Sequence, residues 1–160
     1  MYQIGEKIVY PMHGAGIVQA IEEKEVLGET QKYYVLKIAS TEMKLMVPVN
    51  TAESIGVRPV ITPSDLQEVF QNVQNSVDEE ESPNWNKRYR ENLSKIKTGD
   101  IVEVAKVVKS LTNREKEKPL STCEKKLLTN ARSILVSEFI LSTDDTEDKA
   151  EERVDMLIGL

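Results

Sequence analysis

Residues 5–18 read Gly-Glu-Lys-Ile-Val-Tyr-Pro-Met-His-Gly-Ala-Gly-Ile-Val, and this stretch decides the fold at the start of the chain. A short apolar strand runs into Pro11, a turn contains Gly14 and Gly16, and a second apolar strand begins at Ile17. Proline fixes φ before the turn, and glycine adopts backbone conformations that are closed to other residues. The pattern predicts a tight connection between two strands of a small, strongly bent all-β module. It is typical of a binding module and not of a catalytic loop.

Further β-rich segments follow at residues 31–38, 43–49 and 56–61. They are rich in tyrosine, valine and isoleucine, which favour strands, and each is short. Leu27-Gly28-Glu29 is a turn signal between the second and third strands. Four or five short strands within 60 residues predict a Tudor-like or SH3-like β-barrel.

From Thr62 onward the apolar residues recur with a helical period instead of alternating. Five helices are predicted, beginning near residues 62, 82, 99, 121 and 146, with an acidic loop at 78–81 between the first two. Ser121 and Glu124 form a capping box that opens the longest helix. We therefore predict an α+β protein of two domains: a Tudor/SH3-like β-barrel in residues 1–61 and an all-α domain of about five helices in residues 62–160.

The composition is that of an ordinary globular protein, with 39% hydrophobic and 30% charged residues among 160. No apolar run approaches the roughly 20 residues that a membrane helix needs. The first residues do not resemble a secretory signal, and the single cysteine excludes an intrachain disulfide. We expect a cytoplasmic monomer with no membrane association.

Charge is distributed unevenly along the chain, although the net charge is only −6. Residues 61–82 contain six acidic and no basic side chains, whereas residues 83–142 contain 13 basic and 7 acidic ones. Such a local positive excess suits a polyanionic partner such as nucleic acid. Ordinary solvated helix faces explain the charge equally well when it is considered by itself.

Signatures of enzymes and metal sites are missing from the sequence. There is no Walker-type phosphate loop, no His-Glu-x-x-His and no Cys-x-x-Cys. His13, the only histidine, is interpreted as a turn residue at a strand edge, and Cys123 as a small buried hydrophobic residue near a helix start. We predict that the protein is not an enzyme and that it uses no metal and no cofactor.

Residues 84–90, Asn-Trp-Asn-Lys-Arg-Tyr-Arg, place the only tryptophan among three cations near the start of a helix. Helical periodicity puts Trp85 on one stripe with Tyr89 and favours packing in the core. The position at the helix N-terminus favours an exposed aromatic ring, because a side chain there protrudes beyond its neighbours. An exposed aromatic ring beside lysine and arginine is suited to wedging into or stacking on nucleic acid.

A second basic set lies on the longest predicted helix. Lys125, Thr129 and Arg132 are spaced i, i+4 and i+7 and form a polar stripe, which Lys126 flanks. Three cations and a hydroxyl on one face suit contacts with phosphates. A solvated helix face is the alternative interpretation of this stripe.

Taken together, these motifs resemble the CarD/CdnL family of bacterial transcription regulators. The resemblance spans essentially the whole chain and is carried by residues 9–16, 34–37, 47–48, 84–93 and 120–128. It implies that the N-terminal Tudor-like domain docks on the β subunit of RNA polymerase. It also implies that the helical domain contacts promoter DNA at the upstream edge of the transcription bubble, where a tryptophan wedges into the minor groove and stabilises the open complex.

Carried over residue by residue, the resemblance implies Trp85 as the wedge and Arg88, Arg90 and Lys125 as DNA contacts. Lys126 and Arg132 complete the predicted DNA-binding set. For polymerase docking, the resemblance implies the strand around Lys24 and a second strand that consists of Lys44, Leu45, Met46 and Val47. Some family members carry a basic residue where this chain has Met46, which favours an apolar contact there.

No group of residues for reading base edges is visible, so we expect little sequence specificity. The alternative hypothesis is a protein-interaction module that docks on polymerase while its helical domain binds another protein. In that case Trp85 is a buried residue or an interface anchor. The two hypotheses differ in the exposure of Trp85 and in whether the cations share its face.

Overall fold

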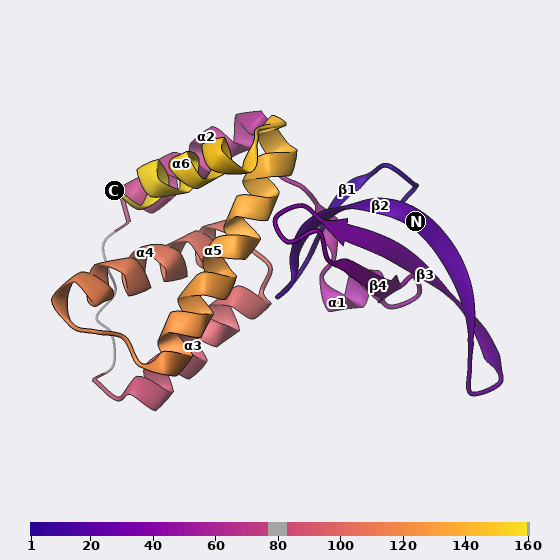
Figure 1. Cartoon of the computed structure of the whole chain (residues 1–160), viewed down its shortest axis with the longest axis horizontal. Coiled ribbons are helices and arrows are strands. Elements are labelled where there is room, and N and C mark those ends of the chain that lie inside the picture. The colour runs from indigo at the N-terminus through magenta and orange to yellow at the C-terminus, as the bar shows by residue number, and fades with distance from the viewer. Residues whose placement is uncertain (77–82, 160) are drawn as a thin grey trace.

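The computed structural model describes residues 1–76 and 83–159, so the acidic loop predicted at 78–81 lies outside the described residues (Figure 1). The first part of the chain, here called the sheet part, contains β1 (Lys7–Tyr10), β2 (Gly14–Val26), β3 (Glu29–Ile38), β4 (Lys44–Pro48), α1 (Ala52–Ile55) and β5 (Arg58–Pro59). The helical part contains α2 (Pro63–Gln74), α3 (Trp85–Lys97), α4 (Ile101–Glu117), α5 (Thr122–Thr143) and α6 (Glu147–Ile158). The α+β class and the order of a small sheet followed by helices are confirmed.

The sheet has the strand order β4-β3-β2-β1-β5, and all neighbours are antiparallel. The predicted turn between β2 and β3 is confirmed, with φ values of 52° at Leu27 and 81° at Gly28. These two strands are long, so their hairpin projects well beyond the rest of the sheet (Figure 1). The core of the sheet part consists of Ile8, Val18, Tyr34, Leu36, Ile38, Val47, Ala52 and Val57.

Two features of the sheet part differ from the sequence prediction. Residues 52–55 form a short helix, α1, in a region that was expected to contain only strands and loops. The closing strand predicted over residues 56–61 shrinks to the two residues of β5, because Gly56 adopts a φ of 98° as the C-cap of α1. The first residue of the predicted strand, Gly56, therefore belongs to the end of α1.

The opening motif connects β1 to β2 as predicted, and it also carries the contact with the helical part. A Cβ atom at Gly16 would clash with the backbone oxygen of Lys37, so only glycine fits against β3 there. Pro11 is buried, and its Cγ lies 2.9 Å from the place where a Cβ of Gly99 would stand. The opening motif thus forms a hairpin turn and also packs against the turn between α3 and α4.

Helix α5 runs through the middle of the helical part, and its C-terminal half reaches the sheet (Figure 1). Ser137 accepts a hydrogen bond from the backbone N–H of Ala15 at 2.8 Å. Glu138 accepts hydrogen bonds from both terminal nitrogens of Arg58 at 2.7 Å and from the N–H of Ile61 at 2.9 Å. These polar contacts, which are buried or half-buried, fix the helical part to the sheet part.

The core of the helical part is a single cluster to which α2 to α6 all contribute. Its fully buried residues include Val73 of α2, Ile96 of α3, Leu111 of α4, Phe139 of α5 and Leu157 of α6. Within the described ranges, no helix is long and apolar enough to cross a membrane.

Candidate nucleic-acid interface

Trp85 is the first residue of α3, and its side chain is exposed. Asn84 caps the helix by accepting a hydrogen bond from the N–H of Asn86 at 3.0 Å. The face of α3 that turns inward carries Arg88, Asn92 and Ile96, all of which are buried. Trp85 lies on that face, but one turn before its first buried residue, and 47% of its surface is exposed. Of the two interpretations of Trp85, the structure supports the ring that protrudes at a helix end.

Arg88 is buried, which corrects the expectation that it contacts DNA. Its Nε and Nη2 donate to the two carboxylate oxygens of Glu124 at 3.0 and 2.9 Å, and the side chains are only 5% and 3% exposed. A guanidinium group is buried only when a partner compensates its charge, and Glu124 of α5 supplies that partner. The hydrogen bonds from Arg88 hold the pKa of Glu124 below its usual range, although burial acts in the opposite direction.

The Arg88–Glu124 pair fixes the first turn of α3 against the first turn of α5. Trp85 precedes Arg88 by one helical turn, and Lys125 directly follows Glu124. The N-terminal ends of these two helices consequently lie side by side (Figure 1). Ser121 adds the predicted cap, since its Oγ accepts from the N–H of Glu124 at 3.2 Å. A buried ion pair therefore brings an exposed aromatic ring and an exposed cation to the same end of the molecule.

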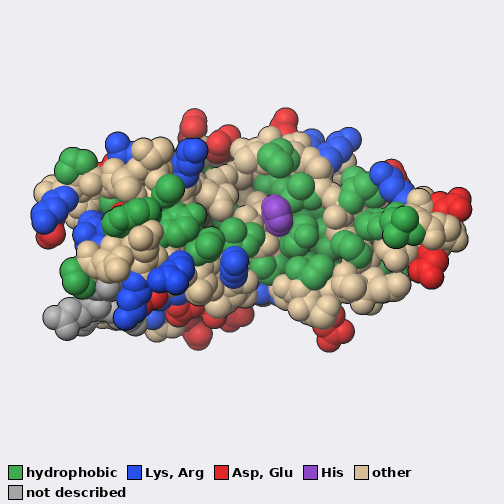
Figure 2. All heavy atoms as spheres, turned by 90° about the horizontal axis from the view of Figure 1, so that it is seen from below, with side chains coloured by type: hydrophobic (Ala, Val, Ile, Leu, Met, Phe, Trp, Pro, Cys, Tyr) green, Lys and Arg blue, Asp and Glu red, His purple; other side chains and the backbone are tan. Residues whose placement is uncertain are grey.

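The other cations at this end differ in how accessible they are. Lys125 and Lys126 are exposed and line a shallow hollow of about 450 Å³ on α5, together with Thr122, Thr129, Asn130 and Ser133. Arg90 is exposed, with a weak hydrogen bond from its Nε to Asn86 O at 3.4 Å. On the face seen in Figure 2, lysine and arginine side chains gather over the helical part.

Arg132, the last member of the predicted stripe, is already paired within the protein. Its Nε and Nη2 donate to Glu151 Oε2 at 2.8 and 2.6 Å, and Nη2 also donates to Asp155 Oδ1 at 2.7 Å. The expectation of a free cation at this position is corrected, because two carboxylates of α6 neutralise it. Charge spacing along α5 could not reveal this pairing, which depends on where α6 packs.

The residues predicted for polymerase docking lie in two places on the sheet. Lys24 is exposed on the projecting β2–β3 hairpin, and Lys44 is exposed at the start of β4, which forms one edge of the sheet. Leu45 and Met46 are half-buried, and Val47 is fully buried in the core of the sheet part. The side chain of Val47 is thus not a contact residue, because alternation along β4 turns it inward.

Two further predictions concern single residues. His13 lies in the turn between β1 and β2, as predicted, and its ring centroid is 4.4 Å from that of Tyr10. Cys123 was expected to be buried, and it is exposed at the second position of α5. In the first turn of this helix the inward-facing position belongs to Glu124, which turns Cys123 toward solvent. Among the residues described, no cluster of metal-ligating side chains is found.

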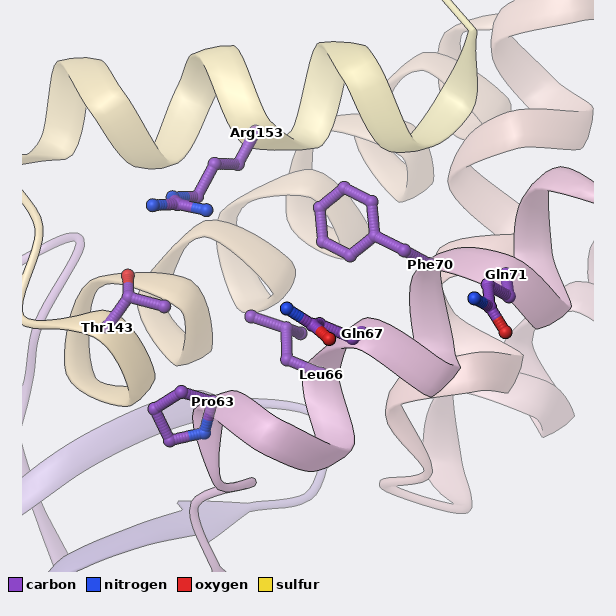
Figure 3. Close-up of a pocket in the computed structure, with 7 residues that line it drawn as sticks. All are labelled: Pro63, Leu66, Gln67, Phe70, Gln71, Thr143 and Arg153. Atoms are coloured by element: carbon purple, nitrogen blue, oxygen red, sulfur yellow. The ribbon is translucent and has the colours of Figure 1, made fainter.

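A groove of about 620 Å³ lies between α2 and α6 (Figure 3). Pro63, Leu66, Gln67, Phe70 and Gln71 of α2 form one side of it, and Arg153 projects from the opposite helix (Figure 3). Arg153, the one charged residue among its described lining, is engaged by Asp145. The groove therefore presents mainly apolar and amide groups and offers no pair of titratable groups for acid–base chemistry.

Sequence reasoning missed the residues that hold this interface in place. The capping box identified Glu124 as a helix cap and gave no sign of its bond to Arg88. Asn92 is also buried, and its Nδ2 has no hydrogen-bond partner within the described part. Asn92 follows Arg88 by four positions, so the two side chains lie on the same inward face of α3.

The chain joins a small antiparallel sheet to a helical bundle that exposes cations and an aromatic ring. Comparison with protein families gives two matches: "CarD-like/TRCF RID domain" over residues 2–61 and "CarD, C-terminal domain" over residues 68–155. The chain therefore belongs to the CarD family, a family of transcription factors and not of enzymes.

A relative from Bacillus subtilis agrees with the family assignment. The chain is 45% identical over 147 residues to a Bacillus subtilis (strain 168) protein named "Putative transcription factor YdeB", covering 92% of this chain and 95% of that protein. The solution NMR structure of the 72-residue N-terminal domain of Myxococcus xanthus CarD is 32% identical, with a TM-score of 0.33. It covers 37% of this chain and 79% of that domain.

Proposed function

We propose that this protein is a monomeric transcription regulator that docks on the β subunit of RNA polymerase and stabilises the open promoter complex. In this proposal the helical part contacts DNA at the upstream edge of the bubble, with little sequence specificity. The observation that carries the proposal is the exposure of Trp85 beside accessible cations, on a helix end held by a buried ion pair. Membership of the CarD family supports the same conclusion.

The physical case for a wedge rests on what an exposed indole ring gains by contacting bases. Half of the Trp85 surface meets water in the free protein, and stacking on a base or entering the minor groove removes it from water. Such a contact contributes about 1–3 kcal/mol, which corresponds to about a fivefold to hundredfold shift between closed and open complexes.

The cations supply contacts that position the protein without reading sequence. Arg90, Lys125 and Lys126 are the exposed members of the predicted set, so we expect about three phosphates to be neutralised. That number gives a slope of about −2 to −3 for log K against log salt, which means weak binding to free DNA at physiological salt. Polymerase docking then has to provide most of the affinity.

In this proposal the protein docks on polymerase through the β4 edge and the β2–β3 hairpin. An edge strand offers unpaired backbone groups that another protein extends by strand addition. Lys44 and Met46 face away from the core on β4, and Lys24 is exposed on the hairpin. These groups lie on the sheet part, whereas the N-terminal end of α3, which begins with Trp85, points away from the sheet (Figure 1). In this proposal that end is available for DNA.

The test is a fluorescence assay of promoter opening by the cognate polymerase with wild type and Trp85→Ala. Because Trp85 is largely outside the core, we expect the variant to fold and to bind polymerase, while bubble collapse becomes about fivefold to a hundredfold faster. Met156→Ala, which removes an apolar side chain that is 63% exposed on α6, is the matched control and should behave as wild type. Circular dichroism establishes that each variant is folded.

Undiminished stabilisation by a folded Trp85→Ala variant would contradict the DNA contact and favour the protein-interaction module. The lone cysteine gives a second, independent test, because Cys123 is exposed two residues before Lys125. A photo-crosslinker attached to Cys123 should label promoter DNA at the upstream bubble edge in the polymerase complex. A Cys123→Ser/Thr30→Cys variant, labelled on the far hairpin, should not label that DNA position.

A further inference from the structure

Only part of the polar face of α5 is accessible to a partner. Lys125 and Arg132 lie on this face two turns apart, and both were expected to meet phosphates. Lys125 is exposed, whereas the side chain of Arg132 is only 27% exposed. The two cations therefore differ in exposure because of the residues around them, since both lie on the same face of the helix.

Two carboxylates of α6 hold Arg132 through Nε and Nη2, two donors that a phosphate group would also use. Glu151 Oε2 accepts from both Nε and Nη2, and Asp155 Oδ1 accepts from Nη2 at 2.7 Å. The backbone oxygen of Glu151 lies 3.3 Å from the same Nη2. Guanidinium groups bind carboxylates and phosphates with the same fork of donors, so the two ligands compete for one site.

The surface along α5 changes sign at this point. The hollow beside Lys125 and Lys126 shares Thr129 and Ser133 with a second hollow of about 320 Å³. That second hollow is also lined by Arg132, Glu147 and Glu151. The two neighbouring hollows thus differ in charge: the one near the start of α5 is lined by two lysines, and the one beside α6 is lined by two glutamates and the paired Arg132.

We propose that Glu151 and Asp155 of α6 occupy the place of DNA phosphates at Arg132 and thereby end the DNA-contacting surface of α5. This inference rests on the proposed function and defines the extent of the same site. The protein then neutralises one phosphate fewer than the spacing of its cations allows. Its affinity for free DNA is kept low, so that it acts on DNA only when polymerase holds it there.

The test uses the intact protein and a fluorescein-labelled duplex with a central unpaired bubble, titrated between 50 and 300 mM NaCl. Glu151→Gln/Asp155→Asn frees Arg132, and we expect the slope of log K against log salt to become steeper by about 0.7–0.9. The matched control is Asp148→Asn/Glu152→Gln, which removes the same two charges at the same i, i+4 spacing from exposed positions of α6. Its slope should remain that of wild type.

Arg132→Gln provides a second arm that does not require α6 to be altered. In the wild-type background it should change the slope by less than about 0.2, because Arg132 contacts no phosphate. In the Glu151→Gln/Asp155→Asn background the same change should remove the whole gain. The inference is overturned if Arg132→Gln flattens the slope in the wild-type background, or if the two double variants bind alike.

Lys125→Gln separates this inference from the function on which it rests. If Lys125→Gln flattens the slope and the two double variants are alike, DNA binding stands and the role of α6 fails. If Lys125→Gln changes nothing and no variant binds the bubble DNA, even when polymerase is added, the proposed function itself fails.

Discussion

Helix α5 carries a buried glutamate near each end, and each one binds an arginine from another element. Glu124 in the first turn binds Arg88 of α3, and Glu138 in the last two turns binds Arg58 of β5. Both pairs have two parallel hydrogen bonds between the guanidinium group and the carboxylate. One pair joins two helices, and the other joins the helical part to the sheet part.

The surroundings of the two pairs differ. Arg88 and Glu124 are both almost fully buried, whereas Arg58 is 29% exposed and also donates to the backbone oxygen of Gly99 at 2.8 Å. In both pairs an arginine serves as a structural tie because a buried carboxylate faces it. The charge that remains available to a partner lies on Lys125 and its neighbours, which have no such carboxylate opposite them in the described part.

The largest effect is expected for Glu124→Gln, which leaves the Arg88 charge buried without a counter-charge. We expect a loss of about 3–5 kcal/mol in the free energy of unfolding at pH 7, measured by urea denaturation. Since the folded-state pKa of Glu124 is lowered, its contribution is present above the unfolded-state pKa and is lost as pH falls through the folded-state pKa. The gap between wild type and variant should therefore shrink from pH 6 to pH 3.

Glu91→Gln is the matched control for that experiment, because Glu91 forms an exposed i, i+4 pair with Lys87 at 4.0 Å. We expect it to change stability by less than about 0.5 kcal/mol. A loss for Glu124→Gln that is equally small, or that does not depend on pH, would show that the Arg88 pair is not a structural tie.

The second effect in size is expected for Glu138→Gln at the junction with the sheet. Arg58 keeps its hydrogen bonds to Gly99 O and reaches solvent, so the loss should be about 2–3 kcal/mol and smaller than for Glu124→Gln. Urea denaturation of both variants under the same conditions measures the difference. A larger loss for Glu138→Gln than for Glu124→Gln would mean that the junction with the sheet contributes more to stability than the α3–α5 contact.

Ser137→Ala tests the neutral hydrogen bond beside the Glu138 pair. The substitution leaves the buried N–H of Ala15 without its acceptor, and we expect a loss of about 1–3 kcal/mol in urea denaturation. Ser142→Ala removes a half-buried hydroxyl that donates to Ile61 O, and it serves as the control with a smaller loss. Equal losses in both variants would indicate that the Ala15 contact contributes nothing beyond an ordinary hydrogen bond.

The smallest effect is expected for Asp144→Asn at the C-cap of α5. Asp144 binds Lys7 Nζ at 2.9 Å, but its side chain is 85% exposed, so water and salt screen the pair. Asparagine accepts the φ of 52° at this position as readily as aspartate does. We expect a change of less than about 0.5 kcal/mol, measured by thermal unfolding at 20 and 200 mM NaCl. A large loss of stability that depends on salt would show that this exposed ion pair also stabilises the protein.

Local signals in the sequence predicted the elements of this fold well. Pro11, Gly14 and Gly16 located the first hairpin, and the Ser121–Glu124 box located the start of α5, because turns and caps depend on a few adjacent residues. Helical periodicity also found the five long helices. The turn and the cap are determined by a few adjacent residues, and the periodicity by residues within each helix.

The partners of the charged residues could not be predicted in the same way. Arg88 and Arg132 look like surface cations in the sequence, and both are paired with glutamates 36 and 19 residues away. Val47 was assigned to a contact surface, and its alternation within β4 turns it into the core. Those outcomes depend on tertiary packing, which places an element from elsewhere in the chain opposite each side chain.

Because α5 is fastened at both ends, its helical phase is fixed as well as its length. The helix has 22 residues, so it spans about 33 Å at about 1.5 Å per residue. Inserting one residue between the two buried glutamates would turn one end relative to the other by about 100°. Arg88 and Arg58 could then no longer both meet their carboxylates. Insertions of seven residues, about two full turns, would restore the rotation and lengthen the helix by about 10 Å. The number of residues between Glu124 and Glu138 is thus constrained more strictly than the identity of most residues at the surface between them.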